Sequence, residues 1–175
     1  GRNVSEQPLL LYAKLSPDYL PVPESCRFTG ITPQLVDQMG IKESEMIDRL
    51  LSEMMKSGTI TTGFNSIGFD DECTRSTLYR NLYDPYEREY SNGCSRWDIL
   101  NLVRATRDLR PQGMVFDKKN PETGFTSFKL TDLTEENNID QKGAHDALMD
   151  VRATINVARL IKKNQPKLWN WALSI

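Results

Sequence analysis

Apolar residues recur every three or four positions in two long segments of the chain, residues 43–55 and 144–163. This spacing places them on one face of an α-helix, so each segment is predicted to be an amphipathic helix that buries that face. The apolar positions are Met46, Ile47, Leu50, Leu51 and Met54 in the first segment, and Leu148, Val151, Ile155, Ala158 and Ile161 in the second. Gly58 is expected to end the first helix.

Two shorter apolar runs, residues 9–15 and 59–64, predict β-strands. The second is rich in β-branched residues, and a turn at 65–69 is expected to lead from it into a helix over 70–83. The prolines between 17 and 23 predict an irregular connection, because proline does not fit the interior of a helix or of a central strand. Further helices are expected after the Thr32-Pro33 N-cap, over 97–107 and within 128–137, and a surface loop over 109–124. This loose alternation predicts an α/β fold with helices packed on a sheet.

The composition narrows the class of protein. The chain has 175 residues, of which 38% are hydrophobic and 26% charged, as expected for one globular domain. Apolar runs fall short of the roughly 20 residues that cross a bilayer, so a membrane protein is not expected. The cysteines, Cys26, Cys73 and Cys94, are three in number and widely spaced, which predicts neither disulfides nor a zinc site and fits a reducing cytoplasm. With a net charge of −2, any nucleic-acid site must be a local basic and aromatic surface.

The single histidine of the chain, His145, lies five residues before Asp150. If a helix begins near Asp146, His145 lies in its entry and Asp150 one turn inside, so both side chains can reach one site. A carboxylate that holds Mg²⁺ beside an imidazole that takes a proton from water is a minimal apparatus for phosphodiester hydrolysis. The spacing alone favours the alternative of a helix start with Asp146 as N-cap, His145 in an exposed loop and Asp150 solvated.

Asp70 is a second candidate, because it follows the turn after the predicted strand 59–64. Active sites of open α/β sheets gather at the carboxyl edge of the strands, where this turn would bring the carboxylate. The alternative is that Asp70, Asp71 and Glu72 only offset the positive end of a helix dipole. Asp70 and Glu72 point about 200° apart on a helix, so they cannot serve together as metal ligands.

Several motifs resemble the exonuclease I family in order and spacing. The longest are Gly63-Phe64-Asn65-Ser66-Ile67-Gly68-Phe69-Asp70-Asp71-Glu72-Cys73-Thr74-Arg75 and Tyr79-Arg80-Asn81-Leu82-Tyr83-Asp84-Pro85-Tyr86. The others are Asp18-Tyr19-Leu20-Pro21, Thr29-Gly30-Ile31-Thr32-Pro33, Ser95-Arg96-Trp97-Asp98, Ser127-Phe128-Lys129-Leu130 and Ala144-His145-Asp146-Ala147 with Asp150. The resemblance covers nearly the whole chain and implies a ribonuclease H-like exonuclease domain, with a mixed central sheet flanked by helices.

The resemblance implies a 3′-5′ exonuclease that hydrolyses single-stranded DNA to nucleoside monophosphates in DNA repair and recombination. Asp70 and Asp150 would then bind two Mg²⁺ ions, for which Mn²⁺ can substitute, and His145 would be the general base. DNA contacts are implied at Arg75, Tyr86, Tyr90, Arg104, Phe128 and Lys129, with Thr29, Gly30 and Ile31 beside the terminal nucleotide. A cytoplasmic monomer is implied, with single-strand-binding protein reached through domains outside this chain.

The chain also departs from the family. The Asp-x-Glu motif that the family carries on its opening strand is absent, and Lys129 stands where the family has arginine. Residues 1–175 are therefore predicted to form one exonuclease domain truncated at its N-terminus, without its opening strand or the accessory domains that follow it. Two of the four expected metal ligands are missing.

Two alternatives remain open from the sequence. A proofreading exonuclease or RNase of the same superfamily would share Asp70, His145 and Asp150, although residues 79–86 and the motif at 95–98 argue against it. A non-catalytic nucleic-acid-binding remnant is the alternative from another class, and its support is the missing Asp-x-Glu motif.

Overall fold

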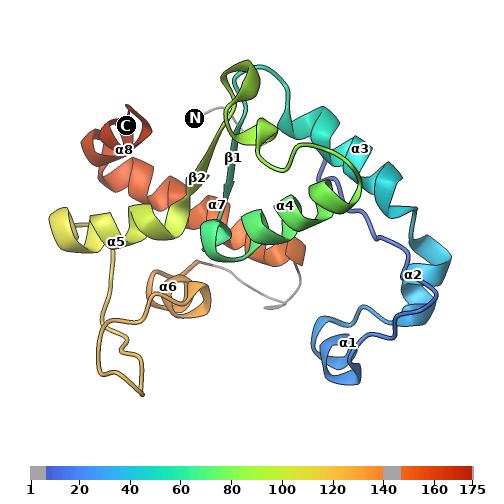
Figure 1. The fold of residues 1–175 in the computed structure, drawn as a ribbon. Coiled ribbons are helices and arrows are strands. Elements are labelled where there is room, and N and C mark those ends of the chain that lie inside the picture. The colour runs from blue at the N-terminus through green and yellow to red at the C-terminus, as the bar shows by residue number, and fades with distance from the viewer. Residues whose placement is uncertain (1–6, 140–146, 175) are drawn as a thin grey trace.

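The structure is a computed structural model that describes residues 7–139 and 147–174. Helices dominate it and surround a sheet of two short strands, as Figure 1 shows. The α-helices are α1 (Pro23–Thr29), α2 (Pro33–Met39), α3 (Glu43–Met54), α4 (Asp70–Arg80), α5 (Ile99–Leu109), α6 (Leu130–Glu136), α7 (Ala147–Asn164) and α8 (Pro166–Ser174). The strands are β1 (Ile60–Gly63) and β2 (Ser95–Asp98), and the 3-10 turns are η1 (Ser66–Gly68), η2 (Glu87–Glu89) and η3 (Ser91–Gly93).

The sheet pairs β1 with β2 in parallel, with Ile60 opposite Ser95 and Gly63 opposite Asp98. The connection between them contains α4, η2 and η3, as a parallel crossover requires a long segment. Both strands end at the same edge, so the turn after β1 and the start of α5 after β2 lie next to each other. The architecture is the predicted α/β arrangement.

The core lies where α5, α6, α7 and α8 meet. Val103, Leu133, Val157 and Ile161 are fully buried there. Trp97 of β2 joins this core through an edge-to-face contact with Trp169 of α8, with ring centroids 5.0 Å apart. Over the part of α7 that the structure describes, the predicted apolar stripe is confirmed only in part, because Ala158 and Ile161 are buried whereas Val151 is exposed. The buried face of the helix also includes Ala153 and Val157.

Several predicted elements are confirmed with small shifts. The helices predicted over 43–55, 70–83 and within 128–137 correspond to α3, α4 and α6, and the strand predicted over 59–64 corresponds to β1. The Thr32 N-cap is also confirmed, because its hydroxyl accepts a hydrogen bond from the backbone N–H of Leu35.

Three local predictions are wrong. Residues 9–15 do not form a strand: Ala13 makes one isolated parallel bridge with Ile41, and Leu9 and Leu10 are exposed. The irregular connection extends only to Val22, because Pro23 occupies the first helical position of α1, where its missing N–H costs nothing. The helix predicted from residue 97 begins instead at Ile99, because Ser95–Asp98 pairs with β1 and Asp98 caps α5.

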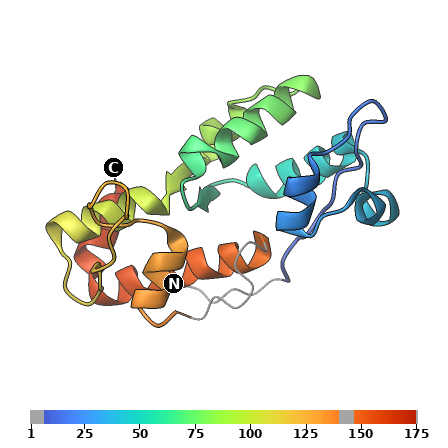
Figure 2. The same cartoon turned by 90° about the horizontal axis from the view of Figure 1, so that it is seen from below.

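The helices α1 and α2 form an arm at one end of the molecule, opposite α5 and α6. Figure 2 shows this arm, in blue, set apart from the helices that contribute the core. Among the described residues, no helix combines the length and apolar character needed to cross a membrane.

Candidate active site

A buried carboxylate, Asp98, shapes the turn after β1. Its Oδ1 accepts hydrogen bonds from the backbone N–H groups of Asn65 and Leu100, both at 2.9 Å, and its Oδ2 accepts one from Ile67 at 3.2 Å. Asn65 adopts a left-handed conformation with φ of 60°, which asparagine tolerates better than most residues. One side chain at the end of β2 thus fixes the turn that leads into α4.

Asp70 is the first residue of α4 and lies directly after this turn. Asp70 is an exposed residue and lines a cavity of about 1170 Å³ along β1 and α7. Partial desolvation raises the pKa of Asp70 above its ordinary value, and the negative charges of Asp71 and Asp98 act in the same direction. A cation in this cavity would oppose that shift, because an opposite charge favours the ionised carboxylate.

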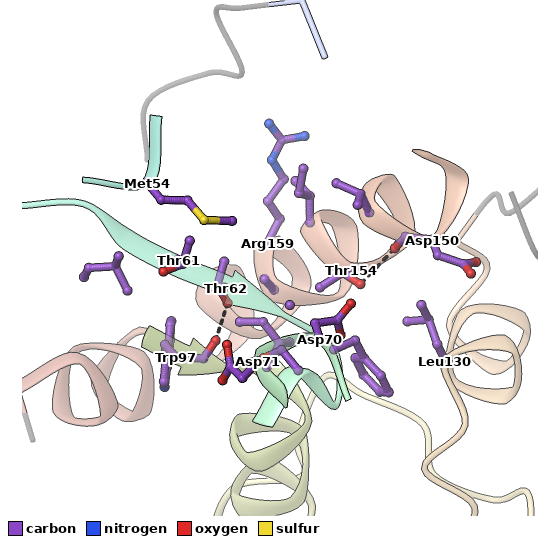
Figure 3. A pocket seen from close by; sticks show the side chains of 18 of the residues that line it. Met54, Thr61, Thr62, Asp70, Asp71, Trp97, Leu130, Asp150, Thr154 and Arg159 are labelled. Carbon is purple, nitrogen blue, oxygen red and sulfur yellow. Dashed lines mark hydrogen bonds between the residues drawn. The ribbon is translucent and has the colours of Figure 1, made fainter. Parts of the chain in front are cut away.

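Asp150 lies in the first turn of α7 and lines the same cavity as Asp70. The hydroxyl of Thr154, one turn later, donates a hydrogen bond to the backbone carbonyl of Asp150 at 2.8 Å. Figure 3 shows Asp70 and Asp150 on either side of Thr154. Asp70 of α4 and Asp150 of α7, 80 positions apart in the sequence, are therefore both among the residues that line one cavity.

The donor set of this cavity fits a hard divalent cation in chemistry, because Mg²⁺ and Mn²⁺ prefer carboxylate oxygens. Within residues 7–139 and 147–174, no group of three or more His, Cys, Asp or Glu side chains is placed to hold a metal ion. Two carboxylates supply fewer oxygen ligands than two divalent cations require. His145 lies outside the described residues, so its place relative to Asp150 is not part of the structure.

A second cavity, of about 580 Å³, adjoins Asp150 from the other side. Three residues that the resemblance implies in DNA binding line it together: Arg104 of α5, and Phe128 and Lys129 before α6. The guanidinium of Arg104 lies over the ring of Phe128, 5.8 Å from its centroid. Two cations and an aromatic ring beside a carboxylate make a surface that suits phosphates and a stacked base.

Three more of the implied DNA contacts, Arg75, Tyr86 and Tyr90, form a separate group on α4 and around η2. Arg75 donates two hydrogen bonds to the carboxylate of Glu89, both at 2.8 Å, and its guanidinium lies 5.0 Å from the ring centroid of Tyr86. Hydrogen bonds to Glu89 are the largest cause that raises the pKa of Arg75, and Glu72 acts in the same direction. Tyr86 and Tyr90 are exposed. In this structure Arg75 is therefore an ion-pair partner that orients an exposed tyrosine.

Thr29, Gly30 and Ile31 end α1 on the outlying arm. Gly30 adopts φ of 72° and its N–H donates to the carbonyl of Cys26 at 2.9 Å, and the N–H of Ile31 donates to the Thr29 hydroxyl at 3.2 Å. None of the three lines either of the two cavities described above. The structure thus leaves this segment apart from Asp70 and Asp150.

Sequence reasoning missed two features that shape the site. Asp98 received no role of its own from the sequence, and nothing in the sequence indicated that the buried Asp71 and Arg88 form a charged cluster with the partly exposed Arg96. Asp71 and Arg88 are joined by a bond of 2.7 Å although they lie 17 positions apart. Charged residues are common on surfaces, and no periodicity marks the pair that will be buried.

Comparison with known proteins defines the class. A family model described as "Exonuclease" matches residues 2–158. The chain belongs to this exonuclease family.

Within that family the similarity is to exonuclease I. The exodeoxyribonuclease I of Buchnera aphidicola subsp. Acyrthosiphon pisum is 47% identical over 99% of this chain and 41% of its own length. That of Haemophilus influenzae is 46% identical over 97% of this chain and 35% of its own length. The chain thus spans well under half the length of these curated relatives.

Solved structures agree with this similarity. Exonuclease I of Methylocaldum szegediense is 50% identical with a TM-score of 0.87, over 97% of this chain and 35% of that one. Escherichia coli exonuclease I in complex with a dA16 oligonucleotide is 42% identical with a TM-score of 0.88, over 95% and 35%. Related structures contain zinc with single-stranded DNA, and the C-terminal peptide of SSB. The fold is that of the exonuclease I nuclease domain, as the resemblance implied.

Proposed function

We propose that residues 1–175 contribute to the active site of a metal-dependent 3′-5′ exonuclease that degrades single-stranded DNA to nucleoside monophosphates. The observation that carries this proposal is the placement of Asp70 and Asp150 on one cavity, in a fold with a TM-score of 0.88 to a DNA-bound exonuclease I. The proposed setting is DNA repair and recombination, and the proposed protein is a cytoplasmic monomer.

Asp70 and Asp150 are proposed to hold divalent cations with their carboxylate oxygens. Two Mg²⁺ ions are expected, with Mn²⁺ as a substitute. Such ions, when bound, stabilise the attacking and leaving oxygens of a phosphodiester and favour ionisation of water. Their ligand shell needs further oxygens, which an Asp-x-Glu strand outside residues 1–175 is expected to provide.

His145 is proposed as the general base. Asp150 lies in the first turn of α7, and His145 precedes it by five positions in the sequence. The neutral imidazole would accept a proton from the attacking water, a contribution of about 10²–10⁴-fold in rate.

Single-stranded DNA is proposed to bind along the second cavity. Arg104 and Lys129 would pair with phosphates, and Phe128 would stack on a base, each stack contributing about 1–3 kcal/mol. Arg75, Tyr86 and Tyr90 are proposed as a second contact group farther along the strand. The proposed role of Thr29, Gly30 and Ile31 at the terminal nucleotide rests on the resemblance and requires the α1 arm to approach the site.

Contact with single-strand-binding protein is proposed to occur outside residues 1–175. The complex of exonuclease I with the SSB C-terminal peptide supports such a partner for that relative, of which this chain covers 35%.

The test is degradation of a 5′-labelled single strand in the presence of Mg²⁺ or Mn²⁺. The natural protein that contains residues 1–175 is expected to shorten the strand from its 3′ end, and a strand blocked at that end is the control. Residues 1–175 alone are expected to show little or no turnover, because two carboxylates cannot fix two ions. Turnover restored by adding the upstream strand would support the proposal.

Two other outcomes would favour the alternatives. Preferential degradation of RNA, or of a mismatched duplex end, would indicate a related RNase or proofreading enzyme. Binding of single-stranded DNA without metal-dependent turnover by the natural protein would indicate a non-catalytic binding module.

A further inference from the structure

The first turn of α4, where Asp70 lies, is not held by a side-chain helix cap. Phe69 at the N-cap position makes no side-chain capping bond and is itself 66% exposed. Within α4 only Asp71 and Leu78 are buried. Because Leu78 lies two turns farther along the helix, the apolar core does not determine where the first turn of α4 lies.

A buried cluster of charges holds this first turn instead. Asp71 is 5% exposed, and each of its two carboxylate oxygens accepts a hydrogen bond from a different arginine. Arg88 Nη2 donates to Oδ1 at 2.7 Å, and Arg96 Nη1 donates to Oδ2 at 2.9 Å. Because each oxygen has its own partner, the carboxylate cannot rotate without breaking one of the two bonds.

The cluster connects α4 to both strands of the sheet. Arg96 belongs to β2 and also binds Glu89 of η2 through its Nε at 2.9 Å. Arg88 belongs to η2 and reaches Thr61 of β1, with Nη1 3.4 Å from the hydroxyl. The first turn of α4 is thus tied to the elements whose carboxyl ends form the edge of the candidate site.

Asp70 and Asp71 are consecutive, so their side chains leave the helix about 100° apart. In the view of Figure 3, Asp71 lies on the side of Trp97 and Asp70 on the side of Thr154. With Asp71 fixed to the two arginines, the direction in which the Asp70 side chain leaves the helix is fixed as well.

The chemistry of the cluster favours a geometric purpose over a stabilising one. Arg88 is 2% exposed, and its buried Nε has no hydrogen-bond partner among the described residues. Buried ion pairs contribute little net stability compared with apolar side chains of similar size, because desolvating both charges offsets their attraction. Apolar packing at this position would hold the helix without defining the rotation of its first turn.

We propose that Asp71, together with Arg88 and Arg96, is a positioning unit for the carboxylate of Asp70. The inference rests on the proposed function to the extent that it assigns Asp70 to a divalent cation. Residues that orient a metal ligand typically change metal affinity or activity by about 10–100-fold when they are replaced. The unit acts on the metal site and leaves the DNA surface at Arg104, Phe128 and Lys129 unchanged.

The experiment compares Asp71→Asn with the parent in the natural protein that contains residues 1–175. Mn²⁺ binding is measured by electron paramagnetic resonance without DNA, and the Mn²⁺ dependence of turnover is measured at saturating single-stranded DNA. Asp71→Asn is expected to need about 10–100-fold more Mn²⁺ in both measurements, with an unchanged KM for DNA.

Leu78→Ala is the matched control, because it removes the other buried side chain of α4 without touching the cluster. It is expected to lower the stability of the protein and to leave Mn²⁺ binding of the folded protein unchanged. Arg96→Lys is the milder variant, since Arg96 is 32% exposed and lysine keeps the charge but not the fork that bridges Asp71 and Glu89. Its Mn²⁺ requirement is expected to lie between those of the parent and Asp71→Asn.

The outcomes separate this inference from the proposed function. Weaker Mn²⁺ binding in Asp71→Asn and Arg96→Lys supports the positioning unit even if the parent shows no turnover, in which case only the proposed function fails. Mn²⁺ binding equal to the parent in both variants overturns it, as does an equal loss in Leu78→Ala. A parent protein that binds no Mn²⁺ also overturns it.

Discussion

The two sides of the sheet are attached to the rest of the molecule by different interactions. On one side, α5, α6, α7 and α8 bury Val103, Leu133, Val157 and Ile161 completely. On the other side, the first turn of α4 is held by the buried carboxylate of Asp71. Apolar packing tolerates small displacements, whereas an ion pair with a separate donor for each oxygen defines a direction.

We propose that these two regions have different roles. The helical core supplies stability, and it carries Asp150 on the rigid helix α7. The charged side supplies orientation, and it carries Asp70 at the start of a helix that has no capping bond. The candidate site lies where these two regions meet.

The largest expected effect is a loss of turnover, without a loss of stability, when His145 is replaced. His145→Ala is expected to lower turnover by about 10²–10⁴-fold, because it removes the imidazole that is proposed to take the proton from water. Affinity for single-stranded DNA and the free energy of unfolding should change little. Single-turnover kinetics with equilibrium binding on the natural protein checks this, and full turnover at neutral pH would exclude His145 as the general base.

The next effect concerns the helical core. Leu133→Ala is expected to lower the free energy of unfolding by about 2–5 kcal/mol, because Leu133 is fully buried and its removal leaves a cavity. Leu82→Ala is the control, since Leu82 is 95% exposed and such surface changes usually stay within about 0.5 kcal/mol. Urea unfolding measures both variants. Equal losses for the two would show that the core does not lie around α6.

A smaller effect is expected on the DNA surface. Lys129→Ala should weaken binding of single-stranded DNA and reduce the slope of log K against log salt concentration by about 0.7, the value for one lost phosphate contact on a single strand. Turnover at saturating DNA should be retained. Binding measured across a salt series checks this prediction, and an unchanged slope would remove Lys129 from the proposed path.

The smallest effect concerns pH. Hydrogen bonds from Arg80 hold the pKa of Glu43 below its ordinary value and join α3 to α4. A lowered folded-state pKa adds stability above the unfolded value of 4.5, and this stability is lost as pH falls through the folded value. The difference in free energy of unfolding between the parent and Glu43→Gln should therefore shrink as the pH falls below about 4.5. Urea unfolding at several pH values measures the difference, and a constant gap would contradict the prediction.

The helical side of the molecule was predictable from the sequence, because burial imposes a period of 3.6 on its apolar residues. The helix α7 and the Thr32 N-cap are examples, and both have local signals, although Val151 of the predicted stripe is exposed. The strand β2 lacked such a signal, because Ser95-Arg96-Trp97-Asp98 shows neither β-branched residues nor alternation. Pro23 was misread because its position within the first turn of a helix depends on where the helix begins.

The candidate site was predictable only in part. Asp70 could be placed at a strand edge from the turn that precedes it, and Asp150 in a helix from the stripe that follows it. The cluster around Asp71 joins residues 17 and 25 positions apart, and many other pairs of opposite charge have similar separations. Which of them becomes buried depends on the crossover between β1 and β2, a tertiary property.

The most direct test of the central claim, that Asp70 and Asp150 form one metal site, is a crystal structure of the natural protein that contains residues 1–175, grown with Mn²⁺. Anomalous scattering locates Mn²⁺ independently of the protein density. The account predicts a peak bound by carboxylate oxygens of both Asp70 and Asp150. Ordered density for both side chains without a Mn²⁺ peak between them, at a concentration that supports turnover, would contradict it.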